Sequence, residues 1–274
     1  MADEQWGAAM RLLWGPQPPA KPARGPKRGL TLEGIALAGV GIADAEGLAA
    51  VSMQRVAGEL AVTKMALYRY VPGKAELVAL MVEAALPVPG AGSVEGGGWR
   101  ERLGVWAREL YAGFRRHPWL LEATVGVRVM GPRELGWMER ALAALDGCGL
   151  SGAEAMDAVV LVAGHVRGIA EQERAVGRPV GGGGDAGVGA GAEADEGRGA
   201  GRGAGRGGGP DAQLAVMLGE VMRVRGEEFP ALGAVLASAA EQGGYDQALE
   251  FGLERILDGL GLLVARRVGG EGGR

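Results

Sequence analysis

Residues 51–71 read VSMQRVAGELAVTKMALYRYV, and this stretch contains two helix starts of the same design. Ser52 and Thr63 belong to the residue types that cap helices, because their hydroxyl groups accept a hydrogen bond from a backbone N–H of the following turn. Each cap is flanked by an apolar pair that can close over that turn, Val51 with Val56 and Val62 with Leu67. Only about three residues separate the two helices, so they cross steeply, which predicts a helix-turn-helix.

The outer surface of the second helix is aromatic and cationic, although only 5% of the chain is aromatic. Leu67 and Val71 point toward the first helix, which leaves five side chains facing outward: Lys64, Met65, Tyr68, Arg69 and Tyr70. Arg and Lys donate hydrogen bonds to guanine, and Tyr can bind phosphate or touch a thymine methyl group. The pattern favours a helix that enters a DNA major groove. The alternative is that the tyrosines only cover the surface of the domain.

The composition indicates an all-α protein. The chain has 274 residues, of which 47% are hydrophobic, enough to fill a core, and its apolar runs are built from Ala, Leu, Val and Met at helical spacing. Cys148 is the only cysteine, which excludes an intramolecular disulfide framework and favours a reducing compartment. We find no export signal or membrane-spanning run and expect a cytoplasmic protein with no membrane partner.

Charge is distributed unevenly along the chain, whose net charge is -4. Residues 15–86 carry eight Lys or Arg and six Asp or Glu, whereas the rest of the chain is acidic. A mildly basic N-terminal region, residues 15–86, can approach a polyanion while the acidic remainder of the chain stays soluble. This charge distribution therefore permits DNA binding by residues 15–86.

Four zones follow from composition and periodicity. Residues 1–29 form an N-terminal arm, basic and proline-rich over 15–29, which we expect to be flexible. Residues 30–86 hold the three-helix DNA-binding domain with its helix-turn-helix, and residues 99–274 form a larger helical domain for ligand binding and dimerisation. Within it, residues 177–209 are a glycine-rich insert that we expect to be disordered. Helices over 151–176 and 246–266 carry apolar stripes, which predict a four-helix interface in a homodimer.

Residues 31–86 resemble the N-terminal DNA-binding domain of the TetR family of bacterial transcriptional repressors. The resemblance rests on ADAEGLAAVSM and ALYRYVPGKAEL in that domain. Farther along, HPWLLEA, GPRELGWMERALAAL and LVAGHVRG are similar to the tetracycline-repressor-like branch of C-terminal domains. The resemblance implies a repressor that binds a palindromic double-stranded DNA operator as a homodimer and is released by a small-molecule effector. No cofactor is implied.

Carried over position by position, the resemblance makes residues 63–70 the recognition helix. It implies the following DNA-binding residues: Ser52, Met53, Gln54, Thr63, Lys64, Met65, Tyr68, Arg69, Tyr70 and Lys74. Lys74, at the start of the next helix, would contact phosphate. Ala61, in the turn, stands where the family usually has glycine; if the backbone there needs a positive φ, alanine costs on the order of 1 kcal/mol.

Large and titratable side chains in the C-terminal domain are candidates for the effector pocket. They are Trp106, His117, Trp137, Met138, Met156 and His165. Aromatic and methionine side chains at helical spacing also suit a plain core, and a histidine on an apolar helix also suits a hydrogen-bonded core position. Both interpretations remain open from the residues alone.

Two other function classes are considered. An enzyme is disfavoured, because neither histidine has a cysteine or carboxylate at metal-ligand spacing and no nucleophile or phosphate-binding motif occurs. An RNA-binding role of the segment GRGAGRGAGRGGG is the other alternative. It lacks interleaved aromatic residues, and acidic groups precede it, so a linker is favoured.

Overall fold

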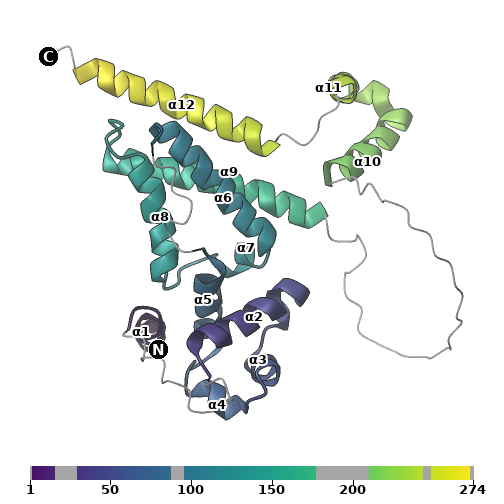
Figure 1. Ribbon diagram of the computed structural model, residues 1–274. Helices are drawn as coiled ribbons and strands as arrows, with labels where there is room; N and C mark the ends of the chain where they lie inside the picture. Colours follow the sequence, from purple (N-terminus) through teal and green to yellow (C-terminus); the bar gives the residue numbers. More distant parts are fainter. Residues whose placement is uncertain (1, 16–29, 88–95, 177–209, 243–247, 272–274) are drawn as a thin grey trace, which may run out of the picture. The chain divides into compact units, whose positions relative to one another are not determined.

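The computed structural model describes residues 2–15, 30–87, 96–176, 210–242 and 248–271, and every regular element in these ranges is helical (Figure 1). The all-α prediction is confirmed. The chain divides into two units, one of residues 1–171 and 249–274 and one of residues 172–248. The α-helices are α1 Ala2–Trp14, α2 Leu32–Glu46, α3 Met53–Glu59, α4 Lys64–Tyr68, α5 Lys74–Ala85, α6 Trp99–Arg116, α7 Leu120–Ala123, α8 Pro132–Ala144, α9 Gly152–Val176, α10 Pro210–Arg225, α11 Pro230–Gln242 and α12 Ala248–Glu271.

Helix α1 corrects the expected arm over residues 1–29. Ala2–Trp14 is a helix rather than part of a flexible arm, because Leu13 is 7% exposed and packs into the hydrophobic core of the first unit. The Trp14 indole N–H donates a hydrogen bond of 2.9 Å to the carbonyl of Met130, just before α8. The proline-rich residues 16–29 lie outside the described residues.

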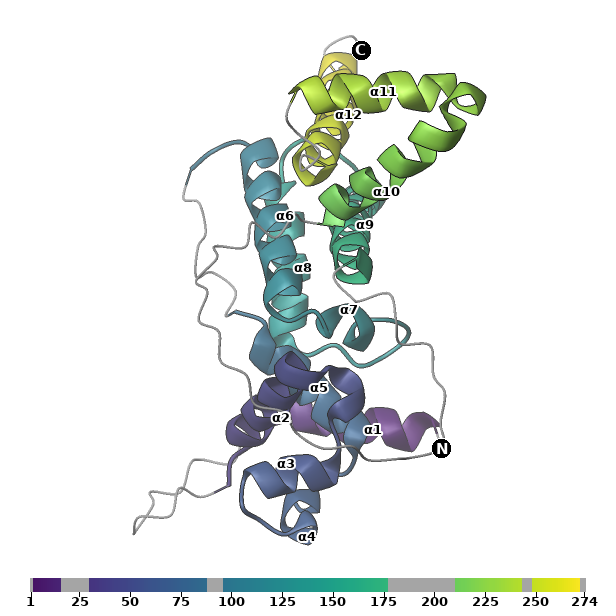
Figure 2. The ribbon, with the colours of Figure 1, turned by 90° about the vertical axis from the view of Figure 1, so that its right-hand side faces the viewer.

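Helices α2, α3, α4 and α5 cover the domain expected over residues 30–86, and the 3-10 turn η1, Leu48–Ala50, connects α2 to α3 (Figure 2). Their shared core consists of fully buried aliphatic side chains, among them Ile35, Val51, Val56, Leu67 and Met81. Thr31 caps α2 by accepting a 3.0 Å hydrogen bond from the Gly34 N–H. The expected caps and apolar pairs thus serve to hold short helices that would be marginal alone.

The C-terminal helices of the first unit bury the stripes expected from the sequence. Leu103, Trp106 and Phe114 of α6 are buried, as are Leu253 and Leu257 of α12. Ion pairs join these two helices at their surfaces: Arg100 with Glu254 and Asp258, and Arg108 with Glu250. Helix α9 confirms the long helix expected over 151–176.

The second unit contains α10, the 3-10 turn η2 (Gly226–Glu228) and α11. Several large apolar side chains of this helix pair are exposed, including Val216, Met217, Phe229 and Val235. The insert over 177–209, for which the sequence leaves linker and RNA-binding hypotheses open, lies outside the described residues.

Candidate functional site

The turn between α3 and α4 ends the first helix with two specific backbone hydrogen bonds. The Val62 N–H donates to the Ala57 carbonyl at 2.9 Å, and the Ala61 N–H donates to the Gly58 carbonyl at 3.0 Å. This pair of bonds is the Schellman arrangement, which requires a left-handed residue directly after the helix cap. Ala61 is that residue, with φ of 52°, and it is the only non-glycine residue with positive φ in the described part of the chain. The departure noted in the sequence is therefore a strained position.

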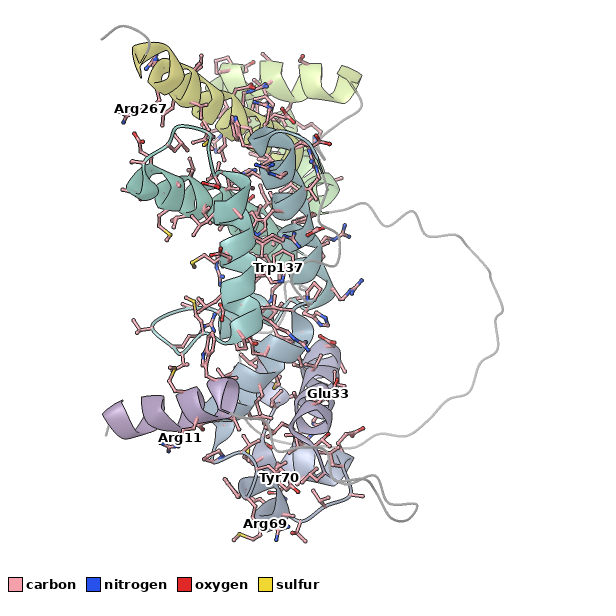
Figure 3. All side chains as sticks on the ribbon, turned by 60° about the vertical axis from the view of Figure 1, so that its left-hand side comes forward. Arg11, Glu33, Arg69, Tyr70, Trp137 and Arg267 are labelled. Atoms are coloured by element: carbon pink, nitrogen blue, oxygen red, sulfur yellow. The ribbon has the colours of Figure 1, made fainter. Side chains whose placement is uncertain are left out.

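Helix α4 presents the predicted DNA-facing residues at the outer end of the domain. The Thr63 hydroxyl accepts a hydrogen bond from the Ala66 N–H at 3.2 Å, which confirms the cap. Leu67 is fully buried and fixes the rotation of the helix. The expected outward side chains are all exposed, Lys64, Met65, Tyr68, Arg69 and Tyr70. Figure 3 shows Arg69 and Tyr70 at this outer end.

The recognition helix is shorter than expected from residues 63–70. Regular helix ends at Tyr68, and Arg69 is its C-terminal cap. The N–H groups of Tyr70 and Val71 still bond to the Leu67 carbonyl, each at 3.0 Å. The last two predicted residues thus lie in a hydrogen-bonded turn, which can aim them differently from a continued helix.

Helix α3 carries the other predicted contacts, and one of them needs correction. Ser52 caps the helix by accepting from the Arg55 N–H at 3.2 Å, and Gln54 is exposed. Met53 is only 5% exposed, because its side chain belongs to the core shared by the helices of this domain. The Met53 side chain is therefore removed from the predicted DNA-facing set.

An ion pair that was not predicted from the sequence joins α3 to α2, and a cation–π contact lies within α4. The Arg55 guanidinium forms an ion pair with Glu46 at the end of α2, with an Nη1 to Oε2 distance of 2.8 Å. The hydrogen bond from Arg55 lowers the pKa of Glu46. The Lys64 ammonium lies 5.7 Å from the centre of the Tyr68 ring, a cation–π contact within α4. Lys74 is exposed at the first position of α5, after Gly73.

Helices α5 and α8 cap each other at the boundary with the C-terminal domain. The two Glu83 carboxylate oxygens accept the backbone N–H groups of Arg133 and Glu134 at 2.8 and 3.0 Å. The Arg133 Nη1 atom donates to the carbonyl of Glu83 at 3.0 Å and to that of Leu86 at 3.4 Å. The Glu83 carboxylate thus accepts hydrogen bonds from the free N–H groups at the start of α8, and the Arg133 guanidinium donates to the free carbonyl groups at the end of α5. Each charge also has the sign that the dipole of that helix end favours. A Cβ at Gly131 would collide with the Glu83 carboxyl group, so glycine permits this approach.

A second tie joins α2 to the segment between α6 and α7. One Asp44 carboxylate oxygen lies 2.8 Å from the His117 Nδ1 atom and accepts the Trp119 indole N–H at 2.7 Å. The His117 side chain is 13% exposed. The structure therefore places His117 against the DNA-binding domain, apart from the other candidates for the effector pocket.

The remaining effector candidates fall into separate places. Trp106 and Trp137 lie together, because the Trp106 indole N–H donates to the Trp137 carbonyl at 2.9 Å, and the half-buried Met138 follows directly. Trp137, labelled in Figure 3, donates in turn to the Pro87 carbonyl at 3.3 Å. Met156 is 40% exposed on α9. His165 bonds the Leu249 carbonyl at 3.0 Å.

The position of the His165 ring also accounts for the glycine at position 252. A Cβ at Gly252 of α12 would collide with the His165 imidazole ring, so the small residue lets α9 and α12 approach around it. This packing matches the hydrogen-bonded core alternative for His165. Ligand binding by any of the six candidates stays a prediction.

Within the described ranges, no three His, Cys, Asp or Glu side chains gather closely enough to hold a metal ion. Over the same residues, none of the helices combines the length and the apolar character that crossing a membrane requires. The features that remain are an exposed aromatic and cationic helix surface and the helix contacts that join it to the C-terminal domain.

Comparison with known proteins agrees with this geometry. Residues 37–81 match the family "Bacterial regulatory proteins, tetR family", and residues 91–264 match "Tetracyclin repressor-like, C-terminal domain". The "HTH-type transcriptional repressor DrrR1" of Streptomyces coeruleorubidus is 37% identical over 270 residues, which cover 95% of this chain and 87% of that protein.

Solved structures of a Streptomyces coelicolor protein share the fold. Apo ActR is 25% identical with a TM-score of 0.64, and the match covers 90% of this chain and 100% of that one. ActR in complex with actinorhodin is 26% identical with a TM-score of 0.63, over 85% of this chain and 96% of the other. The chain belongs to the TetR family of bacterial regulatory proteins and is a DNA-binding, ligand-responsive transcriptional repressor that functions as a dimer.

Proposed function

We propose that this repressor reads its palindromic operator with the α4 surface of each protomer. Tyr68 and Arg69 contact base edges, while Lys74 binds a backbone phosphate next to the first backbone N–H groups of α5. The observation that carries this proposal is the exposed, aromatic and cationic surface of α4, whose orientation is set by the Thr63 cap and the buried Leu67. A bacterial repressor that binds operator DNA is expected in the cytoplasm, which we propose as its location.

The dimer interface is proposed to consist of α9 and α12 from both protomers. Both helices expose apolar side chains that a monomer leaves in water: Met156, Val160 and Leu161 on α9, and Phe251 and Leu262 on α12. A Cβ added at Gly164 or Gly259 would meet no heavy atom within 4 Å, so there is open space over the backbone at both positions. A second protomer would bury these surfaces and cover the backbone at both glycines.

An effector in the C-terminal domain is proposed to release DNA through α8. ActR binds actinorhodin in a related structure, and the paired Trp106 and Trp137 support a comparable apolar ligand here. Trp137 lies on α8, whose first turn is held by Glu83 of α5. A ligand that shifts α8 would therefore shift α5 and change the spacing of the two α4 helices, provided that it binds the shifted state more tightly.

The decisive experiment compares operator DNA, selected from a random pool, with unselected DNA of equal length. Arg69→Ala and Tyr68→Ala should weaken operator binding by about 1 to 3 kcal/mol per lost base contact and change binding to unselected DNA less. Lys74→Ala should weaken both alike and reduce the slope of log K against log salt by about 2 for the dimer, at roughly 0.9 per phosphate.

The matched control is Arg116→Ala, which removes an exposed positive charge from α6 in the C-terminal domain. It should leave operator affinity and the salt slope unchanged. If Arg69→Ala and Tyr68→Ala weakened both DNAs equally, base reading by α4 would be refuted. Recovery of sites without two-fold symmetry would refute the palindromic operator.

A further inference from the structure

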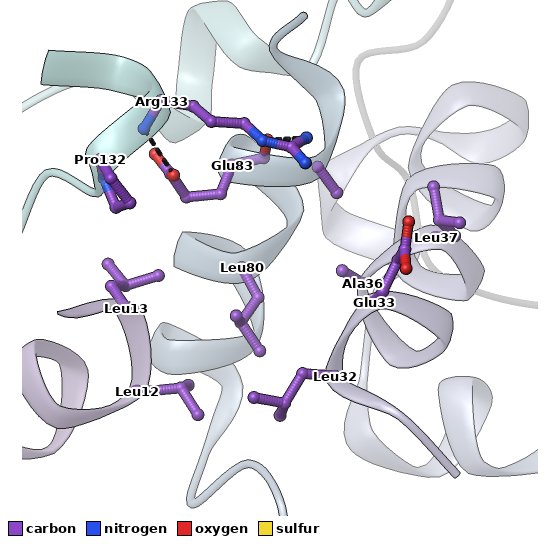
Figure 4. Close-up of a pocket in the computed structure, with 11 residues that line it drawn as sticks. Leu12, Leu13, Leu32, Glu33, Ala36, Leu37, Leu80, Glu83, Pro132 and Arg133 are labelled. Atoms are coloured by element: carbon purple, nitrogen blue, oxygen red, sulfur yellow. Dashed lines mark hydrogen bonds between the residues drawn. The ribbon is translucent and has the colours of Figure 1, made fainter. Parts of the chain in front are cut away.

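A pocket of about 410 Å³ lies where α1, α2, α5 and α8 meet in the first unit (Figure 4). This volume is within the range of small-molecule sites in proteins. We call it the junction pocket. None of the six effector candidates lines it, so it is separate from the Trp106 and Trp137 pair. It also differs from the DNA-facing surface, because no residue of α3 or α4 contributes to it.

The walls of the junction pocket are held in place by contacts already described. Helix α1 is anchored by the buried Leu13 and by the hydrogen bond from Trp14 to Met130. The opposite edge is closed by Glu83 and Arg133, which cap each other's helices. Because these ties hold the α1, α5 and α8 walls, the ordering of these three helices adds little to the cost of binding.

The junction pocket has a mixed lining, in which leucine side chains lie beside the charged residues Glu33, Glu83 and Arg133. Leucine side chains from three helices, Leu12, Leu13, Leu32 and Leu80, lie around a common space in Figure 4, and Leu37 of α2 lines the pocket at an exposed edge. Such a lining favours a compact hydrocarbon or aromatic body, which would remove both its own surface and that of the leucines from water.

One charged group at the pocket, Glu33, has no partner among the residues that the structure describes. Glu83 and Arg133 use their polar atoms to bond helix ends. Glu33, in the first turn of α2, is exposed and makes no hydrogen bond or ion pair with the residues that the structure describes. A free carboxylate beside an apolar space is complementary to a protonated amine, since a charge-assisted hydrogen bond can then form.

We propose that the junction pocket binds amphiphilic amines, with the apolar body among the leucines and the ammonium group at Glu33. Such a molecule would contact the DNA-binding domain through α2 and α5 and the C-terminal domain through α8. The proposal does not rest on operator recognition, because binding to the free protein is sufficient to test it.

The test uses calorimetric titration of the full-length protein with three probes of equal size. They are 4-phenylbutylamine, 4-phenylbutanol and 4-phenylbutyrate, which share the apolar body and differ in the head group. The amine should bind at least tenfold more tightly than the other two at pH 7. Absence of amine binding at millimolar concentration, or equal binding of the amine and the alcohol, would overturn the proposal.

Variants locate the site. Glu33→Gln keeps the shape of the side chain and should abolish the preference for the amine, whereas Glu139→Gln, the same change on the exposed surface of α8, should not alter it. Leu37→Trp, at a 52% exposed lining position, should narrow the pocket and weaken all three probes at least fivefold. Circular dichroism checks that each variant is folded. Unchanged amine binding in Glu33→Gln and Leu37→Trp would place the amine elsewhere and refute the junction pocket.

Discussion

Ala61→Gly should stabilise the protein, although glycine usually weakens a helical domain. Ala61 has φ of 52°, and both Schellman hydrogen bonds of the turn are formed. The turn therefore requires the left-handed conformation, although alanine disfavours it. A non-glycine residue in the left-handed region costs roughly 1 to 2 kcal/mol. Glycine removes that cost but gives back about 0.4 to 1 kcal/mol through the larger freedom of the unfolded chain. The net gain should be about 0.5 to 1 kcal/mol.

Urea unfolding of the full-length protein, followed by circular dichroism at one protein concentration, measures this gain. Ala112→Gly is the matched control, because Ala112 is exposed in the interior of α6, where glycine should cost about 0.5 to 1 kcal/mol. Ala61→Val should be destabilising, since a β-branched side chain tolerates positive φ poorly. If Ala61→Gly lowered stability as much as Ala112→Gly, the strain assigned to the turn would be disproved.

Further predictions concern assembly, the helix junction and acid stability. Val160→Glu, on the exposed face of α9, should give monomers in sedimentation. The control Val127→Glu, at an 87% exposed position in the loop before α8, should leave the dimer intact. A dimeric Val160→Glu variant would argue against the α9 interface. Glu83→Ala removes the cap of α8 and should lower the unfolding free energy by about 1 to 2 kcal/mol, and no loss in urea unfolding would contradict its capping role. The hydrogen bond from Arg108 lowers the pKa of Glu250 below its ordinary value of 4.5. The stabilisation from this ion pair is therefore complete above that value and is lost as the pH falls through the lowered folded-state pKa. Glu250→Gln should flatten the pH profile of stability below about pH 4.5.

Local sequence was sufficient for the elements whose signals are short in range. The two hydroxyl caps at Ser52 and Thr63 form the expected hydrogen bonds, because a cap involves only the turn that follows it. The outward face of α4 was also predictable, since helical spacing leaves few choices once Leu67 is inside. The left-handed backbone at Ala61 was only a conditional expectation, raised because the resemblance places glycine at that position, and the structure shows it. Residue type alone would have indicated the opposite.

Helix contacts between distant segments could not be read from the sequence. Met53 has the position of a DNA contact, but the packing of α2 and α3 turns its side chain inward. The residues 2–14 read as part of an arm, because the surface that buries Leu13 belongs to the core of the folded unit. The contact of His117 with Asp44, 73 positions earlier, could not be read from the sequence either, and ligand binding by His117 stays a prediction.

The sequence by itself determined the fold class, the helix-turn-helix and the exposed surface of α4, because these depend on composition, spacing and caps within a few residues. Tertiary structure alone decided how the end of α5 packs against the start of α8 and where the junction pocket forms. Glu83 and Arg133 are ordinary surface charges in a helical pattern, and they become capping groups only when the end of one helix meets the start of another 50 residues away. The junction pocket likewise exists only because four helices leave a gap that no single segment of the chain encodes.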